Sequence, residues 1–344
     1  MVRIAALALA ALCALSVVVA ETGARPQKPP VVRIAAVGDM AMAPAFDGGA
    51  TFFSRVRGAL RGDVVLGNLE GTLTTASGSK CTPSSRGCFS FRAPPTYARI
   101  LHRAGFTILN LANNHALDYG RAGQAETVAA LDRAGLRHTG RPAEIAYLLR
   151  GGVLVAVIGF APYPWAQNLL DAAAAKRIVR RAARHADVVV VTMHAGAEGS
   201  NRGHVRPGTE LYLGENRGNP IAFAHAVVDA GADLVIGHGP HVLRGLEWYR
   251  GRLIAYSLGN FLGNGTLSIS GVLGVSAVLQ VRLRQDGSWI SGSLVPVRLV
   301  PPGLPARDPE RSTIPLLRRL SSEDFGRRAV RVSARGVLRP GQAS

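Results

Sequence analysis

Polar side chains that could bind a metal or an anion stand at the end of an apolar run in this chain. The segment 106–111 is apolar and strand-like, and it stops abruptly at Asn113, Asn114 and His115. Two amides and an imidazole at the end of a buried strand are costly to desolvate unless they bind something. A metal ion or an anionic ligand would offset that cost. The alternative is a strand-to-helix turn with Asn113 as its N-cap.

Six residues with metal-binding side chains each follow an apolar run: Asp39, Glu70, Asn114, His194, His238 and His241. In open α/β sheets, ligands bind outside the carboxyl ends of the strands. Neutral imidazole suits Mn, Fe and Zn, and a carboxylate can bridge two ions. We therefore predict a centre for one or two divalent ions that activates water for a displacement reaction. His115 would then protonate the leaving group.

The elements that must position these residues alternate between short β-rich runs and helical patterns, as is typical of an α/β sandwich. The predicted strands are 31–37, 64–66, 106–111, 153–158, 188–193, 234–236 and 253–257, and the predicted helices are 52–60, 95–104, 124–135, 171–185 and 220–230. The segments 275–283 and 290–300 predict strands that close a second sheet. We interpret residues 301–344, rich in Pro and Arg, as a peripheral tail with weak helical pieces.

The N-terminus and the cysteines indicate an exported protein. Residues 1–20 predict a secretory signal peptide or an N-terminal anchor, and residues 21–30 a proline-containing linker. Cys81 and Cys88 lie close together in a loop rich in Ser, Gly and Pro, which in an exported protein predicts a disulfide. A metal-binding pair is disfavoured because the chain has no second cysteine pair to complete a tetrahedral site. The expected location is therefore secreted or associated with a cell envelope.

The formal net charge of +18 comes almost entirely from arginine. A basic surface favours anionic partners such as phosphates, acidic polymers or anionic lipid headgroups. The alternative is an ordinary solvated surface that is rich in arginine. We expect no nucleic-acid partner, because the chain lacks the motifs of nucleic-acid-binding proteins and interleaves few aromatics with its arginines.

Six short motifs occur in a fixed order: Gly38-Asp39, Gly67-Asn68-Leu69-Glu70, Ala112-Asn113-Asn114-His115 with Asp118-Tyr119-Gly120, His194-Ala195-Gly196-Ala197-Glu198, Gly237-His238-Gly239-Pro240-His241 and Tyr256-Ser257-Leu258-Gly259-Asn260-Phe261. Together, over residues 32–261, they resemble the CapA-type poly-γ-glutamate capsule synthesis proteins, a branch of the calcineurin-like metallophosphoesterases. The resemblance implies a four-layer α/β sandwich of two β-sheets flanked by helices, over residues 31–300.

The resemblance also implies roles for individual residues. It implies metal ligation by Asp39, Glu70, Asn114, His194, His238 and His241, with His115 as the acid. Other motif residues, Asn68, Asn113 and Asn260, would support the ligands. Glu198, four residues after His194, could orient that imidazole or be a solvated loop residue, and Asp118 has the same two alternatives with respect to His115.

The chain departs from the metallophosphoesterase pattern at two imidazole positions. Ala41 stands where these enzymes usually carry a histidine two residues after the first aspartate, and Gly239 stands where relatives often carry another. Two functions therefore compete. One is a metal-dependent hydrolase or phosphoesterase that acts on an anionic, polyglutamate-like envelope polymer. The other is a non-catalytic accessory that binds such a polymer or a membrane synthase partner.

Overall fold

The computed structural model describes residues 29–82 and 84–342. The predicted signal or anchor, and all but the last two residues of the predicted linker, lie outside these ranges. Within them, no helix combines the length and the apolar character needed to cross a membrane.

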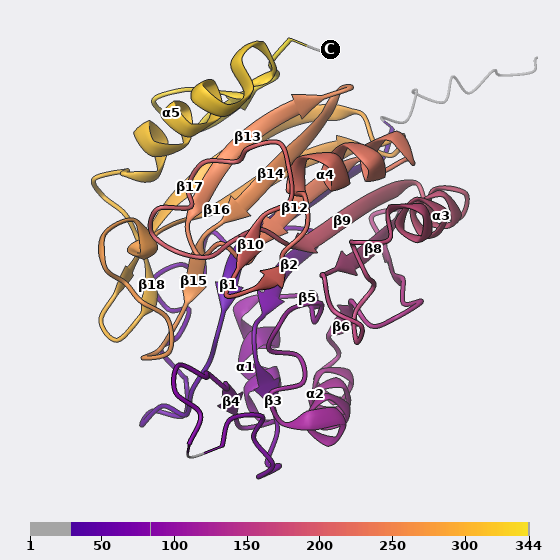
Figure 1. Ribbon diagram of the computed structural model, residues 1–344. Coiled ribbons are helices and arrows are strands. Elements are labelled where there is room, and N and C mark those ends of the chain that lie inside the picture. Colours follow the sequence, from indigo (N-terminus) through magenta and orange to yellow (C-terminus); the bar gives the residue numbers. More distant parts are fainter. Residues whose placement is uncertain (1–28, 83, 343–344) are drawn as a thin grey trace, which may run out of the picture.

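Two large β-sheets face each other, and helices cover the outer face of each (Figure 1). The first sheet has the order β19-β20-β17-β16-β1-β2-β5-β6, with β15 beside β1 and β18 beside β17. Its strands are β1 (Val31–Met40), β2 (Val64–Leu69), β5 (Ile108–Asn110), β6 (Arg137–Thr139), β15 (Asn260–Leu262), β16 (Val275–Arg284), β17 (Trp289–Val300), β18 (Leu304–Arg307), β19 (Arg331–Val332) and β20 (Val337–Arg339).

The second sheet has the order β13-β14-β12-β9-β8-β7. Its strands are β7 (Ala146–Arg150), β8 (Val153–Phe160), β9 (Val188–His194), β12 (Leu234–His238), β13 (Leu243–Tyr249) and β14 (Arg252–Leu258). Two short ribbons lie outside the large sheets: β3 (Thr72–Leu73) with β4 (Arg92–Ala93), and β10 (Leu211–Tyr212) with β11 (Glu215–Asn216).

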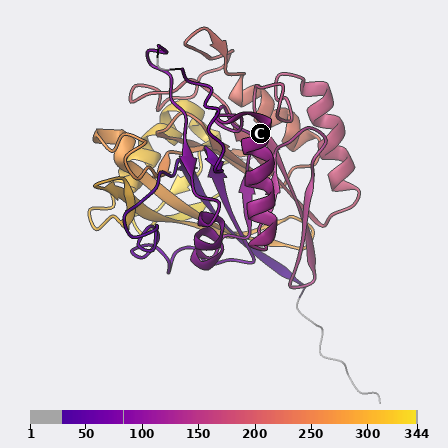
Figure 2. The ribbon, with the colours of Figure 1, turned by 90° about the horizontal axis from the view of Figure 1, so that it is seen from below.

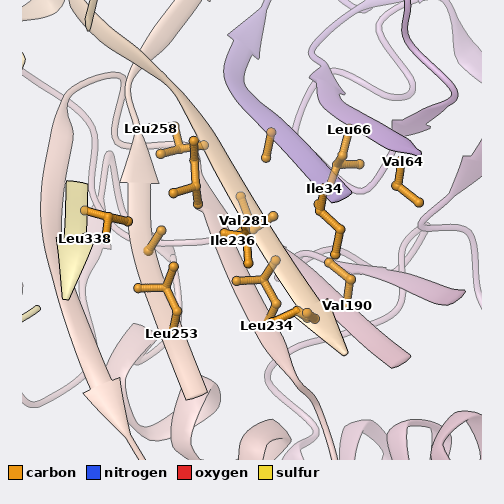
Figure 3. Packing of buried hydrophobic residues seen from close by; sticks show 14 of the residues in the cluster. Ile34, Val64, Leu66, Val190, Leu234, Ile236, Leu253, Leu258, Val281 and Leu338 are labelled. Carbon is orange, nitrogen blue, oxygen red and sulfur yellow. The ribbon is translucent and has the colours of Figure 1, made fainter. Parts of the chain in front are cut away.

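Three buried apolar clusters correspond to the spaces between four layers. Helices α1 (Tyr97–Ala104) and α2 (Gly120–Arg133) pack on the first sheet, and α3 (Ala172–Ala183) and α4 (Pro220–Asp229) pack on the second. The third cluster fills the space between the sheets. There Ile34 and Leu66 of the first sheet pack toward Val190 and Ile236 of the second (Figure 3). The predicted four-layer α/β architecture is confirmed.

The strands that end at the candidate site are buried on both faces. Strand β9 begins with four valines, and its residues are all buried, as are those of β12. Such continuous apolar runs are typical of parallel strands covered on both sides. Strands β8, β9, β12 and β14 are parallel neighbours, so their carboxyl ends meet at one edge.

The predicted helix 52–60 is wrong. This segment is a series of turns in which several amides bond to the carbonyl three residues earlier, as in Val56 N–H to Phe53 O (3.1 Å) and Ala59 N–H to Val56 O (2.7 Å). The apolar spacing that suggested a helix still buries Phe52, Phe53 and Val56 against the first sheet. Glycines within and just before the segment disfavour a continuous α-helix.

The C-terminal part of the chain is not peripheral. Strands β18, β19 and β20 add to the first sheet through β17. Helix α5 (Thr313–Phe325) confirms the weak helical signal, and it buries Ile314 and Leu317 in the cluster between the sheets. In the turned view this yellow C-terminal part lies on the opposite side of the molecule from α3 (Figure 2). Strands β16 and β17 were predicted to close a second sheet, but they extend the sheet that contains β1. Strand β13 was not predicted.

We expect the mutation Leu234→Ala to lower the free energy of unfolding by about 2–5 kcal/mol, because it opens a cavity between the sheets. Leu234 is fully buried there (Figure 3). The matched control is Leu149→Ala, since Leu149 is 65% exposed. Urea denaturation measures both. Equal effects of the two mutations would contradict the assignment of the core.

Candidate metal centre

The two sheets come into direct backbone contact where strand β1 ends. The amide of Asp39 donates a hydrogen bond to the carbonyl of Gly259 (2.9 Å), which lies between β14 and β15. A Cβ atom on Gly38 would lie 1.8 Å from the Gly259 oxygen, so only glycine permits this approach. The contact brings the end of the first sheet against the end of the second.

Three of the predicted ligands meet at this junction. Asp39 ends β1, Glu70 follows β2 and His194 ends β9, and one ligand atom from each lies within 4.8 Å of the others. All three side chains are fully buried. His194 Nε2 lies 3.8 Å from Glu70 Oε1. Residues from both sheets, up to 155 positions apart in the chain, therefore form one cluster.

Both histidines of the 237–241 motif face the same carboxylates. His238 is paired in register with His194, and its Nδ1 atom lies 3.5 Å from Asp39 Oδ1. The two ring nitrogens of His241 lie 3.3 Å from Asp39 Oδ2 and 3.6 Å from Glu70 Oε1. The backbone of His241 has a φ of 62°, which is strained for a non-glycine residue. Its Nδ1 donates to Asn260 Oδ1 (2.9 Å), which helps to hold the ring in place.

A network of buried amides orients Asp39. Asn68 Nδ2 donates to Asp39 Oδ1 (2.8 Å), while Asn68 Oδ1 accepts from Asn110 Nδ2 (2.9 Å) and Asn113 Nδ2 (3.1 Å). The structure thus places the predicted supporting residues Asn68 and Asn113 beside the cluster. Asn110 was not predicted, although it ends an apolar strand as the other site residues do. Asn114 is adjacent in the chain, and its side-chain oxygen is buried without a hydrogen-bond partner among the described residues.

His115 is held by Asp118 as the motif suggested. Its Nδ1 donates to Asp118 Oδ2 (2.8 Å), and the amide of Phe91 donates to the same oxygen (2.6 Å). Lys80 Nζ lies 2.7 Å from Asp118 Oδ1. The Phe91 ring packs on the imidazole, with the two ring centroids 4.3 Å apart. Burial lowers the pKa of His115 despite the neighbouring Asp118. The surroundings therefore favour a neutral ring whose Nδ1 carries the proton.

The predicted disulfide holds the segment that supplies these contacts. Cys81 and Cys88 are joined, with their Cα atoms 5.7 Å apart. Lys80 directly precedes the bridge, and Phe91 follows it by three residues. The disulfide therefore constrains the loop that packs on His115. Lys80 was not found from the sequence, because nothing local marks it as a neighbour of Asp118.

Glu198 does not orient His194. Its Oε1 atom pairs with Arg217 Nη2 instead (2.8 Å), and its Oε2 atom lies 3.6 Å from His241 Nε2. The guanidinium of Arg217 is itself buried and lies 3.3 Å from His194 Nε2. A buried cation attracts a carboxylate more strongly than a neutral imidazole does, which explains the different partner. Arg217 gave no signal in the sequence because arginine is abundant throughout the chain.

Segment 195–219, which carries Glu198 and Arg217, is held in place by a second buried ion pair. Arg244 on β13 is fully buried and binds both carboxylate oxygens of Glu210 at 2.8 Å. Its Nε donates to the carbonyl of Arg202 (2.8 Å), and Glu210 also accepts from the amide of Ala197 (2.8 Å). Removing one partner of such a pair leaves a buried charge uncompensated. This pair therefore fixes the position of the segment over the cluster.

The electrostatics of the cluster fit a divalent cation. Burial raises the pKa of Asp39, but the nearby imidazoles of His238 and His241 outweigh it and hold that pKa well below its usual range. Burial, with Asp39 and Glu198 nearby, raises the pKa of Glu70 well above its usual range. Burial lowers the pKa of His241, yet the surrounding carboxylates overcome this effect and raise it to about 10. Glu70 and His241 thus retain protons that a divalent cation could replace.

Unsatisfied ligand atoms support the same conclusion. Both carboxylate oxygens of Glu70 and both ring nitrogens of His238 are buried without hydrogen-bond partners among the described residues. Burial and the nearby Arg217 lower the pKa of His194 well below its usual value, which keeps it in the neutral form that binds metals. Carboxylate oxygens together with imidazole nitrogens match the preferences of first-row divalent metals. The residues therefore fit a divalent metal site.

Two facing sheets with a buried Asp–Glu–His cluster at their carboxyl ends form an α/β fold of the metallophosphoesterase-like type. A phosphatase from Mycoplasma pneumoniae has a similar fold, with a TM-score of 0.51 over 83% of this chain and 97% of that chain. The two are 12% identical, so the likeness shows the fold alone. Residues 33–265 match the family described as bacterial capsule synthesis protein PGA_cap, which covers more than half of the chain. The chain belongs to this family.

Curated relatives carry the same family assignment. The capsule biosynthesis protein CapA of Bacillus anthracis is 34% identical over 56% of this chain and 48% of its own length. The PGA biosynthesis protein CapA of Bacillus subtilis is 30% identical over 66% of this chain and 59% of its own length. The chain thus spans about half of each of these relatives. The predicted membership of a CapA-type family is confirmed.

We expect Glu70→Gln to weaken the binding of Mn²⁺ at least about tenfold, because it removes a charged donor from a buried site. The matched control is Glu310→Gln, since the Glu310 side chain is 75% exposed. Isothermal titration calorimetry on the metal-free protein measures both variants. Wild-type affinity in Glu70→Gln would contradict the role of this carboxylate as a ligand.

Proposed function

We propose that this protein is an exported, metal-dependent phosphoester hydrolase or transferase of the bacterial cell envelope that acts in a polyglutamate capsule synthesis system. The observation that carries the proposal is the buried Asp39–Glu70–His194 cluster, built from both sheets and flanked by an oriented His115. Family membership supports the link to capsule synthesis. The phosphatase-like fold supports the reaction class.

Asp39, Glu70 and His194 would hold the metal, with Asn114, His238 and His241 as further ligands, and the ion would be Mn, Fe or Zn. When bound, such an ion stabilises the charge that develops on a phosphoryl oxygen. We favour one ion over two. The imidazoles that would complete a second site are replaced by Ala41 and Gly239, and the Arg217 guanidinium already places a positive charge 3.3 Å from His194.

The neutral His115 ring would take up a proton at Nε2 from solvent, with Asp118 stabilising the resulting imidazolium, and would then give that proton to the leaving-group oxygen. Its Nδ1 is engaged by Asp118, so Nε2 is the ring nitrogen available for transfer. Lys80 and the amide of Phe91 hold the Asp118 carboxylate, and therefore the ring, in one orientation. Arg217, fixed beside Glu198, supplies a permanent positive charge that would attract an anionic substrate.

Two features support an extracytoplasmic location. The apolar residues at the N-terminus fit a signal peptide or an anchor. The Cys81–Cys88 disulfide is typical of proteins from oxidising compartments.

A non-catalytic accessory role is the second candidate. The observation that favours it is the pair of replaced imidazoles at Ala41 and Gly239. A Cβ atom at Gly239 would lie 3.1 Å from His194 Nε2, so a histidine there would crowd the ring. In this role the protein would bind a polyglutamate-like polymer or a membrane synthase partner without transforming it.

We expect His115→Ala to lower the rate of Mn²⁺-dependent hydrolysis of bis(p-nitrophenyl) phosphate by about 10²–10⁴-fold, because a positioned proton donor is lost. The control is His102→Ala, which removes an exposed histidine on α1. Metal content is measured in parallel. If the wild-type protein binds Mn²⁺ but hydrolyses no aryl phosphoester, or if His115→Ala is fully active, the catalytic proposal fails and the accessory role is favoured.

We expect Lys80→Met to reduce the same hydrolysis, and Lys80→Arg to restore most of it. The ammonium group of Lys80 holds the carboxylate that orients His115, so a residue that keeps the charge should preserve the orientation. The value of kcat should fall while KM changes little, because Lys80 acts through His115 and Asp118. Equal activities of the two variants would show that the ion pair does not position the ring.

A further inference from the structure

A groove lined by arginine runs along the outer side of helix α3, away from the metal centre. It has a volume of about 470 Å³ and lies between α3 and the loops that follow β6 and β8. Its side chains include Arg177, Arg180, Arg181 and Arg184, together with Gln167 and Ala143. All four arginines are exposed.

The positive charge of this groove is not balanced by the protein. None of the four arginines forms an ion pair with a carboxylate among the described residues, and Arg181 donates only to the carbonyl of Ala143 (3.4 Å). Arg177 with Arg181, and Arg180 with Arg184, are like charges four residues apart on one helix, a spacing that destabilises a helix. An anion bound along this face would relieve that repulsion.

The groove also offers a hydrogen-bond donor without an acceptor. The side-chain nitrogen Nε2 of Gln167 is buried and has no hydrogen-bond partner among the described residues. A carboxylate oxygen is the type of group that would satisfy it. Gln167 is therefore a second observation, independent of the arginines, that points to an acceptor-rich ligand.

One short segment connects the groove to the metal centre. Trp165 Nε1 donates to the carbonyl of Asn113 (3.1 Å) in the amide network of the centre. Two residues later, the backbone amide of Gln167 donates to the carbonyl of Gly140 (3.0 Å), and the Gln167 side chain lines the groove. Segment 165–167 thus contacts both the groove and the amide network of the centre.

We propose that this arginine groove binds an extended polycarboxylate chain of the polyglutamate type. The choice of a polycarboxylate rests on the proposed function, since the family is one of capsule synthesis. Neighbouring guanidinium groups repeat along the helix, so a chain with a carboxylate on every residue can engage several of them together. A single exposed ion pair is weak, but linked pairs reinforce one another. No aromatic side chain lines the groove, which disfavours single-stranded nucleic acid because it binds by base stacking.

The test compares two charge reversals of equal size in the full chain. Arg180→Glu/Arg184→Glu alters the groove. The control Arg99→Glu/Arg103→Glu alters two exposed arginines on α1 that are also four residues apart. Each variant lowers the formal net charge by four. We expect binding of fluorescent poly-γ-glutamate to weaken at least about tenfold in the groove variant and less than about threefold in the control.

A third variant, Gln167→Leu, should also weaken binding, because it removes the unpaired amide. Free glutamate at the same carboxylate concentration should not compete, whereas unlabelled polymer should. Equal losses in the two double variants would show a general charge effect and overturn the proposal, as would equally strong competition by single-stranded DNA. Mn²⁺ binding and thermal melting are measured on every variant. Failure of polymer binding with intact Mn²⁺ binding would refute the groove without affecting the proposed metal centre.

Discussion

The approach of Gly38 to the backbone of Gly259 is the contact on which the rest of the site depends. With no side chain between them, the end of β1 lies directly against the connection from β14 to β15, and Asp39 is hydrogen-bonded across the junction. The two sheets therefore present their carboxyl ends to one point, and any larger residue at Gly38 would separate them. Within the second sheet, Gly237 on β12 makes a similar approach to β14, since a Cβ atom there would lie 2.1 Å from the carbonyl oxygen of Tyr256.

The electrostatic character of the centre follows from that convergence. Carboxylates from the first sheet and imidazoles from the second are buried together, where charge is expensive unless it is compensated. The protein compensates in part with Arg217, which pairs with Glu198 beside His194. The remaining groups show strongly displaced pKa values, with Glu70 favouring its protonated form and Asp39 its ionised form. Neighbouring carboxylates whose pKa values are displaced in opposite directions are typical of functional sites rather than of structural ones.

Much of the fold and the core of the site could be predicted from the sequence. Asp39, Glu70 and His194 were found because each ends an apolar strand, and the ends of parallel strands share an edge. Arg217, Arg244 and Lys80 could not be found in this way. Their partners, such as Glu210 for Arg244, lie across loops whose paths leave no periodic signal. The assignment of 52–60 as a helix failed because a turn series buries the same apolar residues.

The structure of the C-terminal region also could not be predicted from local sequence patterns. Its prolines and arginines suggested a peripheral tail, yet Leu317 is fully buried and β20 pairs with β17. Short strands that join a sheet at its edge depend on partners far away in the chain, so composition alone does not reveal them. The resemblance to known families ended near residue 261 and therefore gave no guidance for this part.

The most direct test of the central claim is a crystal of the protein soaked in Mn²⁺ and measured by anomalous diffraction. The account predicts one strong anomalous peak within coordination distance of Asp39, Glu70 and His194, and therefore at the junction of the two sheets. A peak elsewhere, or a crystal in which these three side chains bind no metal, would contradict it.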